Sequence, residues 1–316
     1  MSQPSSPCPV CRTASDPTIL AQAHWYPFWD RADGGCPACV QQRLLQTLLE
    51  QGDPAFHESV QHSWPLDAEA AFGAIPTPLR LHADPRYAGR GVTLAMVDSG
   101  FYPHPDLVQP RNRIRAWVDA TVEPERVIRF GEDQAPRWPG WDDLASSQWH
   151  GTMTSVVAAG NGFLSHGLYW GLASEADLVL VQVRDREGHI TNASIGRAFR
   201  WLLEHASSLG LLVVSASVSG DPVEPLAGNP VDEAALALVA AGITVVCAAG
   251  NDGVRRLVPP ATAPLLLTVG GIDDRNSFDH EAVDLWHSNY GEGGDGASKP
   301  ELVRSEERRV GKECRL

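Results

Sequence analysis

Residues 91–107 read GVTLAMVDSGFYPHPDL, and the expected fold is built around this stretch. Its first half is a short, almost continuous apolar run, which is typical of a parallel strand buried on both faces. The run stops at Asp98-Ser99-Gly100, a sequence that commonly forms a turn. Because ligands and catalytic groups collect at the carboxyl ends of strands in open α/β sheets, the position of Asp98 indicates a functional carboxylate. The alternative is that Asp98 only caps the turn.

Two later stretches have the same character, with a polar residue at the end of a regular element. Residues 149–160, WHGTMTSVVAAG, have the apolar spacing of a helix that His150 opens. Residues 243–251, ITVVCAAGN, form a second buried-strand run that ends at Gly250-Asn251. The residues following His150 are small, which favours a functional histidine over a histidine packed in the core. Asn251 is either a functional amide or a turn residue after Gly250.

Together, VDSGFYPHPDL, HGTMTSVVAAGNG and ITVVCAAGN resemble the motifs of the subtilisin-like serine peptidases. The resemblance extends from about Ile75 to Val303 and implies a triad in the order Asp, His, Ser. It implies that Asp98 orients His150, that His150 is the general base, and that Asn251 donates its amide to the oxyanion. It also implies that the two walls of the primary specificity pocket are Ser217, Val218, Ser219 and Ala248, Ala249, Gly250.

The catalytic serine is the part of the family pattern that the sequence lacks. After Leu302-Val303 the family continues to a Gly-Thr-Ser segment that carries the serine. Here residues 304–314 resemble the translation of a sequencing-library adapter, RSEERRVGKEC. We therefore expect 304–316 to be an artefactual tail, the peptidase domain of 89–303 to be partial, and the chain as given to be inactive.

The fold class expected from residue 91 onward is α/β. Strands and helices alternate, which implies right-handed crossovers and a parallel sheet with helices on both faces. The family resemblance implies that this sheet is subtilisin-like. The insertion 120–148, just before His150, is a candidate lid or specificity element. Strands are expected at 91–98, 114–119, 178–183, 211–217, 243–248 and 265–269, and helices at 150–159, 192–208 and 229–241.

The first sixty residues carry two Cys-x-x-Cys pairs separated by 24 residues. Four thiolates in two tight pairs can close a tetrahedral site, so we expect a structural Zn²⁺ ion in a small zinc-ribbon-like unit over 1–60, which includes an amphipathic helix at 40–51. The ligands are Cys8, Cys11, Cys36 and Cys39. Disulfides are the alternative. A linker over 61–88 joins this unit to the peptidase domain.

Composition limits the choice of partners. The formal net charge of −14 argues against binding to nucleic acid or to an anionic membrane surface. Residues 1–9 lack a secretory signal, and no apolar run is long enough to span a bilayer, so a cytoplasmic enzyme acting on proteins or peptides is expected. The alternative is a non-catalytic binding module in which the zinc unit docks a protein partner and the subtilase-like domain only presents a cleft. The joint presence of Asp98, His150 and Asn251 favours the enzyme.

Overall fold

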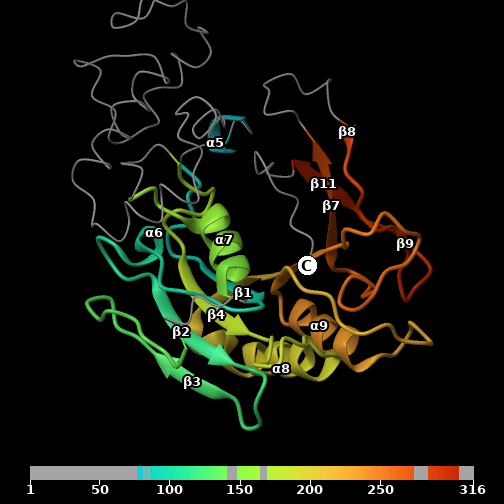
Figure 1. Ribbon diagram of the computed structural model, residues 1–316, viewed down its shortest axis with the longest axis horizontal. Helices are drawn as coiled ribbons and strands as arrows, with labels where there is room; N and C mark the ends of the chain where they lie inside the picture. The colour runs from blue at the N-terminus through green and yellow to red at the C-terminus, as the bar shows by residue number, and fades with distance from the viewer. Residues whose placement is uncertain are drawn as a thin grey trace, which may run out of the picture.

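The structure is a computed structural model, and it describes residues 77–80, 83, 86–140, 148–163, 169–273 and 284–305. The four cysteines expected to bind zinc, the helix expected at 40–51 and most of the linker lie outside these residues. Helix α5 (Thr77–Arg80) is a single turn within the linker. Strand and helix labels follow Figure 1.

The described part is built on a nine-stranded sheet in the order β11-β7-β6-β5-β1-β4-β2-β3, with β8 paired to β7. Adjacent strands are parallel except for the pairs β2–β3 and β7–β8. The strands are β1 (Thr93–Asp98), β2 (Ile114–Asp119), β3 (Arg126–Arg129), β4 (Asp177–Gln182), β5 (Leu211–Ala216), β6 (Thr244–Ala248), β7 (Leu267–Asp273), β8 (Asp284–Leu285) and β11 (Leu302–Ser305). A separate pair consists of β9 (Gly291–Glu292) and β10 (Ser298–Lys299).

Helices cover both faces of the central strands, as the alternation in the sequence predicts. Figure 1 shows α7 (Gln148–Ala159) on one face, and α8 (Asn192–Leu209) and α9 (Pro230–Ala240) together on the other. A short helix, α6 (Pro105–Val108), packs beside α7. All three expected long helices are present. The one at 150–159 is longer than expected, since α7 includes at least two residues before His150.

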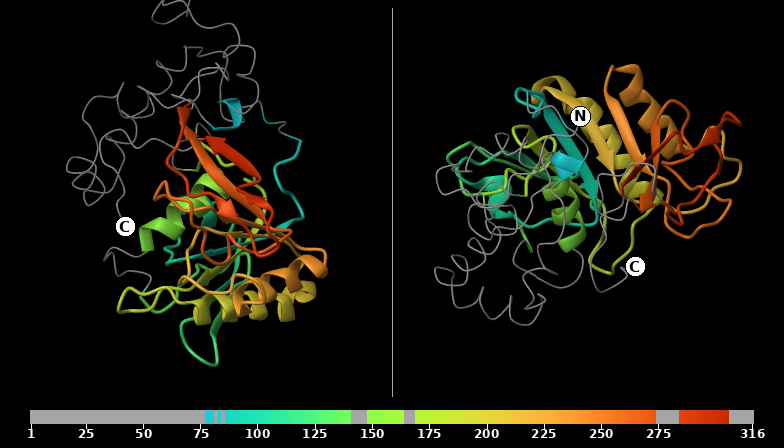
Figure 2. Two further views of the ribbon diagram at one scale, coloured as in Figure 1. Left: turned by 90° about the vertical axis from the view of Figure 1, so that its right-hand side faces the viewer. Right: turned by 90° about the horizontal axis from the view of Figure 1, so that it is seen from above.

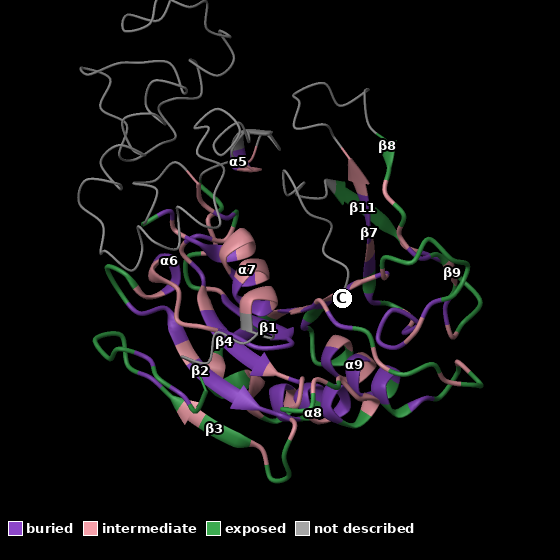
Figure 3. Cartoon of the chain, viewed as in Figure 1, coloured by how far each residue is buried: buried purple, intermediate pink, exposed green. Residues whose placement is uncertain are grey.

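Strand β1 lies at the centre of the core, and all six of its residues are buried. Because strand side chains alternate, Ala95 and Val97 pack in the cluster under α8 and α9, whereas Leu94 and Met96 pack in the cluster under α7. Figure 3 shows similar burial along β4 and β2 on one side of β1, whereas β5 on the other side also has partly buried and exposed residues. The continuous apolar run of the sequence is therefore explained by two-sided burial.

Local sequence signals set the ends of α8 and α9. The hydroxyl of Thr191 accepts a hydrogen bond from the Ser194 amide and caps α8, and Gly210 ends that helix in the left-handed region at φ 60°. The side chain of Asn229 accepts from the Asp232 amide and caps α9. These caps fix the residues at which α8 begins and ends and at which α9 begins.

Part of the insertion 120–148 belongs to the sheet, and its role as a lid or specificity element stays a prediction. Strand β3 pairs antiparallel with β2, and Trp138 is buried with its ring stacked on Trp117 at 5.9 Å between centroids. The segment RVIR of β3 is short and mostly exposed, so it lacks the apolar run that marked the other strands. The expected strand 265–269 is also corrected, because Leu265 has φ 63° and β7 begins at Leu267.

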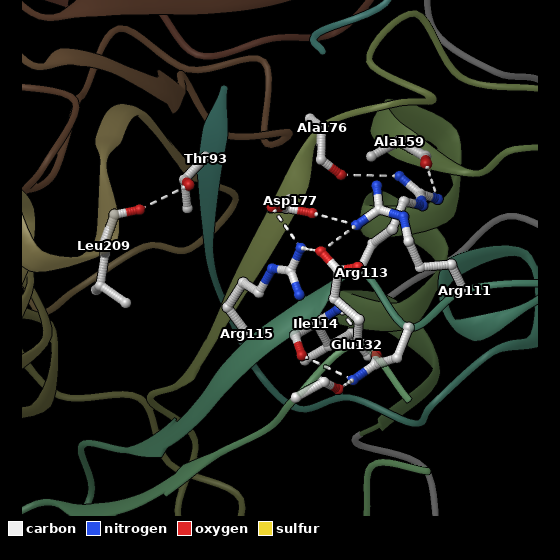
Figure 4. Close-up of polar contacts among 12 residues, drawn as sticks. Thr93, Arg111, Arg113, Ile114, Arg115, Glu132, Ala159, Ala176, Asp177 and Leu209 are labelled. Carbon is white, nitrogen blue, oxygen red and sulfur yellow. Dashed lines mark hydrogen bonds and ion pairs between the residues drawn. The ribbon is translucent and has the colours of Figure 1, made fainter. Parts of the chain in front are cut away.

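A buried arginine ties the far end of α7 to the sheet (Figure 4). The guanidinium of Arg113 donates to three backbone carbonyl oxygens, those of Asp106, Ala159 and Ala176. Burial lowers the pKa of Arg113 to about 10. Because Ala159 is the last residue of α7, Arg113 anchors the helix whose other end carries His150.

The sheet edge formed by β7, β8 and β11 is less covered than the centre (Figure 2, left; Figure 3). Leu302 and Val303, which point to opposite faces of β11, are 53% and 52% exposed, and Leu285 of β8 is 84% exposed. Apolar side chains are therefore uncovered on both faces of this edge. In the described part of the chain, no helix is long and apolar enough to cross a bilayer.

Candidate active site

The structure brings Asp98 and His150 into direct contact. Asp98 is the last residue of β1 and is 1% exposed. Its Oδ1 accepts hydrogen bonds from His150 Nδ1 at 2.7 Å, from the Ser99 amide at 2.6 Å and from Ser99 Oγ at 3.2 Å. Its Oδ2 accepts from Thr154 Oγ1 at 2.9 Å. A buried carboxylate needs such donors to keep its charge.

The tautomer of His150 follows from this contact. The carboxylate oxygen of Asp98 can only accept, so Nδ1 of His150 carries a proton and Nε2 is the basic nitrogen of the neutral ring. The hydrogen bond and the negative charge of Asp98 raise the pKa of His150, and burial of the ring opposes them. The imidazole side chain is 22% exposed, so solvent can reach the ring.

Gly151 allows α7 to approach β1 closely enough for this pair. A Cβ atom at Gly151 would collide with the Gly100 carbonyl oxygen and would lie 2.9 Å from Phe101 Cε1 and 3.0 Å from Asp98 Cβ. The next residue adds a hydrogen bond, in which the Tyr102 amide donates to Thr152 Oγ1. The sequence His-Gly-Thr thus packs the first turns of the helix directly against the end of the strand.

Asn251 and the two expected pocket walls lie at the same edge of the sheet as Asp98. Strands β1, β5 and β6 are adjacent and parallel, so their carboxyl ends are at one edge. Residues 217–219 follow β5 and residues 249–251 follow β6. Asn251 itself is exposed. The expected residues therefore come together by topology, and Asp98 with His150 also by direct contact.

Asn289 holds the turn that carries Asn251, and the sequence reasoning did not identify it. Its buried side-chain oxygen accepts from the amides of Asp252 at 2.9 Å and Val254 at 3.4 Å, and its backbone amide donates to the Gly250 carbonyl. Gly250 has φ 102°, and a Cβ there would lie 2.6 Å from Asn289 Nδ2. The turn therefore requires a glycine at 250.

A hollow of about 380 Å³ is lined mostly by residues that come after the two walls in the chain. It lies between the loops that follow them, and its lining includes Pro222 and Leu226 from one loop and Arg255 and Leu257 from the other. The Gly220 amide donates to the Pro259 carbonyl at 2.8 Å, which joins the two loops. The hollow between these two loops therefore has both apolar and charged lining.

Sequence comparison finds relatives of this chain among known proteases. Serine protease AprX of Bacillus subtilis (strain 168) is 31% identical over 224 residues, which cover 68% of this chain and 46% of AprX. Subtilisin BL of Lederbergia lenta is 27% identical over 190 residues, which cover 60% of this chain and 58% of that protein. The chain spans about half the length of the curated relatives it matches.

The fold of this chain is also similar to that of a solved structure. The solved structure of S41 psychrophilic protease superposes with a TM-score of 0.50 at 20% identity, covering 66% of this chain and 71% of that one. The sequence model of the subtilase family matches residues 89–306, which is well over half of the chain. The chain belongs to the subtilase family of peptidases.

Proposed function

We propose that this chain carries the acid–base part of the catalytic centre of a serine-type endopeptidase. The observation that carries the proposal is the 2.7 Å hydrogen bond between the buried carboxylate of Asp98 and Nδ1 of His150. It leaves Nε2 as a base whose orientation and tautomer are fixed, which is what attack by a hydroxyl on a peptide bond requires.

In the proposed mechanism, Nε2 of His150 removes the proton from the attacking serine as its oxygen bonds to the carbonyl carbon of the substrate. The imidazolium then protonates the leaving amine, and water repeats the sequence to release the acyl group. Asp98 stabilises the imidazolium throughout. The side-chain amide of Asn251 donates to the negative oxygen of the tetrahedral intermediate.

Substrate binding is proposed at the loops that follow β5 and β6. An extended peptide adds as a strand to the backbone of Ser217, Val218 and Ser219, because main-chain hydrogen bonds hold a peptide of any sequence. The substrate side chain before the scissile bond enters between this segment and the wall formed by Ala248, Ala249 and Gly250.

The nucleophile is proposed to come from a segment of the natural polypeptide outside these 316 residues. The printed sequence has no Gly-Thr-Ser segment. A second support is the uncovered sheet edge, where Leu302 and Val303 are half exposed on opposite faces of a parallel strand. Parallel strands are normally covered on both faces, so further chain is expected to pack there.

The test is peptide turnover by the natural polypeptide, expressed with the gene's own sequence after Val303. Asp98→Asn and His150→Ala should each lower kcat by about 10⁴-fold or more. Asn251→Ala should lower it by about 10²- to 10³-fold, the range found for the oxyanion amide of subtilisin. His189→Ala, at an exposed histidine outside the site, is the matched control and should keep full activity. Equal and small effects in the first three variants would refute these roles, and a natural polypeptide with no turnover would favour the non-catalytic binding module.

We also propose that Cys8, Cys11, Cys36 and Cys39 bind one structural Zn²⁺ ion. The support is the spacing of the two Cys-x-x-Cys pairs. Metal analysis should find one zinc per chain, reduced in Cys8→Ser and in Cys36→Ser. Cys247→Ala is the matched control, because Cys247 is a buried, free cysteine of β6 and should not alter the zinc content. Zinc-free protein purified without chelator would contradict the proposal.

A further inference from the structure

The two oxygens of the Asp98 carboxylate are held very differently. Oδ1 accepts from His150 and from both the amide and the hydroxyl of Ser99. Within the described part of the chain, the hydrogen bond found for Oδ2 comes from the hydroxyl of Thr154, at 2.9 Å. Because Asp98 is 1% exposed, water is a poor substitute for that donor.

Thr154 has one hydroxyl proton and two acceptors within reach, Asp98 Oδ2 at 2.9 Å and the Gly151 carbonyl at 3.1 Å. The second acceptor is already occupied, because Ser155 Oγ donates to the Gly151 carbonyl at 2.6 Å. The carboxylate is also the stronger acceptor, since a hydrogen bond to an ionised group is about twice as strong as one to a neutral group. The proton of Thr154 therefore points to Asp98.

We propose that Thr154 is a positioning residue, whose hydroxyl fixes the rotation of the Asp98 carboxylate so that Oδ1 faces Nδ1 of His150. Thr154 and His150 lie one helical turn apart on α7, and both contact the same carboxylate from that helix. The helix thus delivers the base and the group that orients its partner as one unit. The importance of Thr154 for catalysis rests on the proposed function, whereas the hydrogen bond between Thr154 and Asp98 does not.

Loss of the hydroxyl leaves Oδ2 buried without its donor. The carboxylate then rotates to share its remaining donors, and its hydrogen bond to Nδ1 of His150 weakens. This bond is the main reason that the pKa of His150 is raised. Among the described residues, His150 is the titratable group that contacts Asp98. A change in the orientation of the carboxylate should therefore change the pKa of His150.

The experiment is an NMR titration of the 316-residue chain labelled with ¹⁵N-histidine. In Thr154→Val, which keeps the shape of the side chain, the pKa of His150 should fall by about half a unit, and the low-field Nδ1 proton should broaden or move upfield. Thr154→Ser, which restores the hydroxyl, should return both to the wild-type values. Thr154→Ala also lacks the hydroxyl, and it replaces Thr154→Val in the titration if the valine disturbs packing.

Ser155→Ala is the matched control, because Ser155 donates to the Gly151 carbonyl and not to Asp98. Although this change frees the Gly151 carbonyl, the ionised carboxylate remains the stronger acceptor for the Thr154 proton. It should leave the pKa of His150 within about 0.2 unit of the wild type. An unchanged pKa in the folded Thr154→Val or Thr154→Ala protein, or a rise, would overturn the proposal.

Kinetics of the natural polypeptide separate this proposal from the proposed function. Thr154→Val should lower kcat by about three- to tenfold at unchanged KM, because only the orientation of the base is affected. The NMR shift is expected even if the natural polypeptide has no peptidase activity. A pKa shift without turnover would therefore refute the peptidase and support the positioning role, and turnover without a pKa shift would do the reverse.

Discussion

Gly151→Ala tests the close approach of α7 to β1, and with it the geometry of the candidate site. A Cβ atom at this position would lie about 1 Å closer to the Gly100 carbonyl oxygen than an ordinary contact allows. The obstacle is backbone at the end of a buried strand, so it cannot turn aside as a side chain would. The first turns of α7 must therefore move away from β1, which breaks the 2.7 Å bond between Asp98 and His150.

The magnitude follows from two opposing contributions. Alanine in place of glycine in a helix stabilises by about 1 kcal/mol, whereas overpacking a tight site costs about 1–3 kcal/mol and occasionally more. Loss of the charge-assisted hydrogen bond of Asp98 adds about 1.5–3 kcal/mol. The net expectation for Gly151→Ala is destabilisation of about 2–4 kcal/mol, together with a fall in the pKa of His150.

Gly196→Ala supplies the matched control. Gly196 lies within α8 and is buried, but the nearest atom to its added Cβ is Arg200 Nη1, at 3.2 Å. The end of an arginine side chain can move, so the same substitution should stabilise by up to about 1 kcal/mol. Urea unfolding followed by circular dichroism measures both variants. A Gly151→Ala protein as stable as the wild type, with an unchanged His150 pKa, would refute the close-packing argument.

Three further outcomes are expected in urea unfolding. Because Asp98 raises the pKa of His150, the charged pair stabilises the fold most below about pH 6.5, and this contribution is lost as the pH rises through the raised pKa. Asp98→Asn should therefore destabilise the protein more at about pH 5 than at about pH 9. An equal loss of stability at both pH values would contradict the pairing. Arg113→Met should cost about 2–4 kcal/mol, because the buried carbonyls of Ala159 and Ala176 lose the guanidinium donor, while that of Asp106 keeps the Asn161 amide. Arg111→Met, at a partly exposed ion pair, should cost less than about 1 kcal/mol. Asn289→Ala should lower the free energy of unfolding by about 1–2 kcal/mol, since two turn amides lose their acceptor. An unchanged free energy of unfolding would show that the turn is stable without Asn289.

The centre of the sheet could be predicted from the sequence because nearly all residues of β1, β2 and β4 are buried. Strand β1 is a near-continuous apolar run, and it ends at Asp98 as expected. Helix α8 was equally predictable, because Thr191 caps its start. Strand β3 was missed because RVIR is mostly exposed at the edge of the sheet, where burial does not impose an apolar pattern.

The candidate site was only partly predictable. Asp98 and His150 stand at element ends in motifs that resemble a known family, so their contact was expected. Thr154 carried a usable signal, since it lies four residues after His150 and must share its helix face. Asn289 carried none, because it acts on Gly250 and Asp252 through a contact across 37 residues that only the folded chain creates.

In the proposed enzyme, Asp98 and His150 activate a serine of the natural polypeptide. The most direct measurement is labelling by a fluorophosphonate probe, which reacts only with an activated hydroxyl. The natural polypeptide should be labelled at one serine, His150→Ala should abolish the labelling and His189→Ala should keep it, while the 316-residue chain stays unlabelled. Labelling of the 316-residue chain at one serine would show that the nucleophile lies within it. Labelling of the natural polypeptide that persists in His150→Ala would contradict the assignment of His150 as the base.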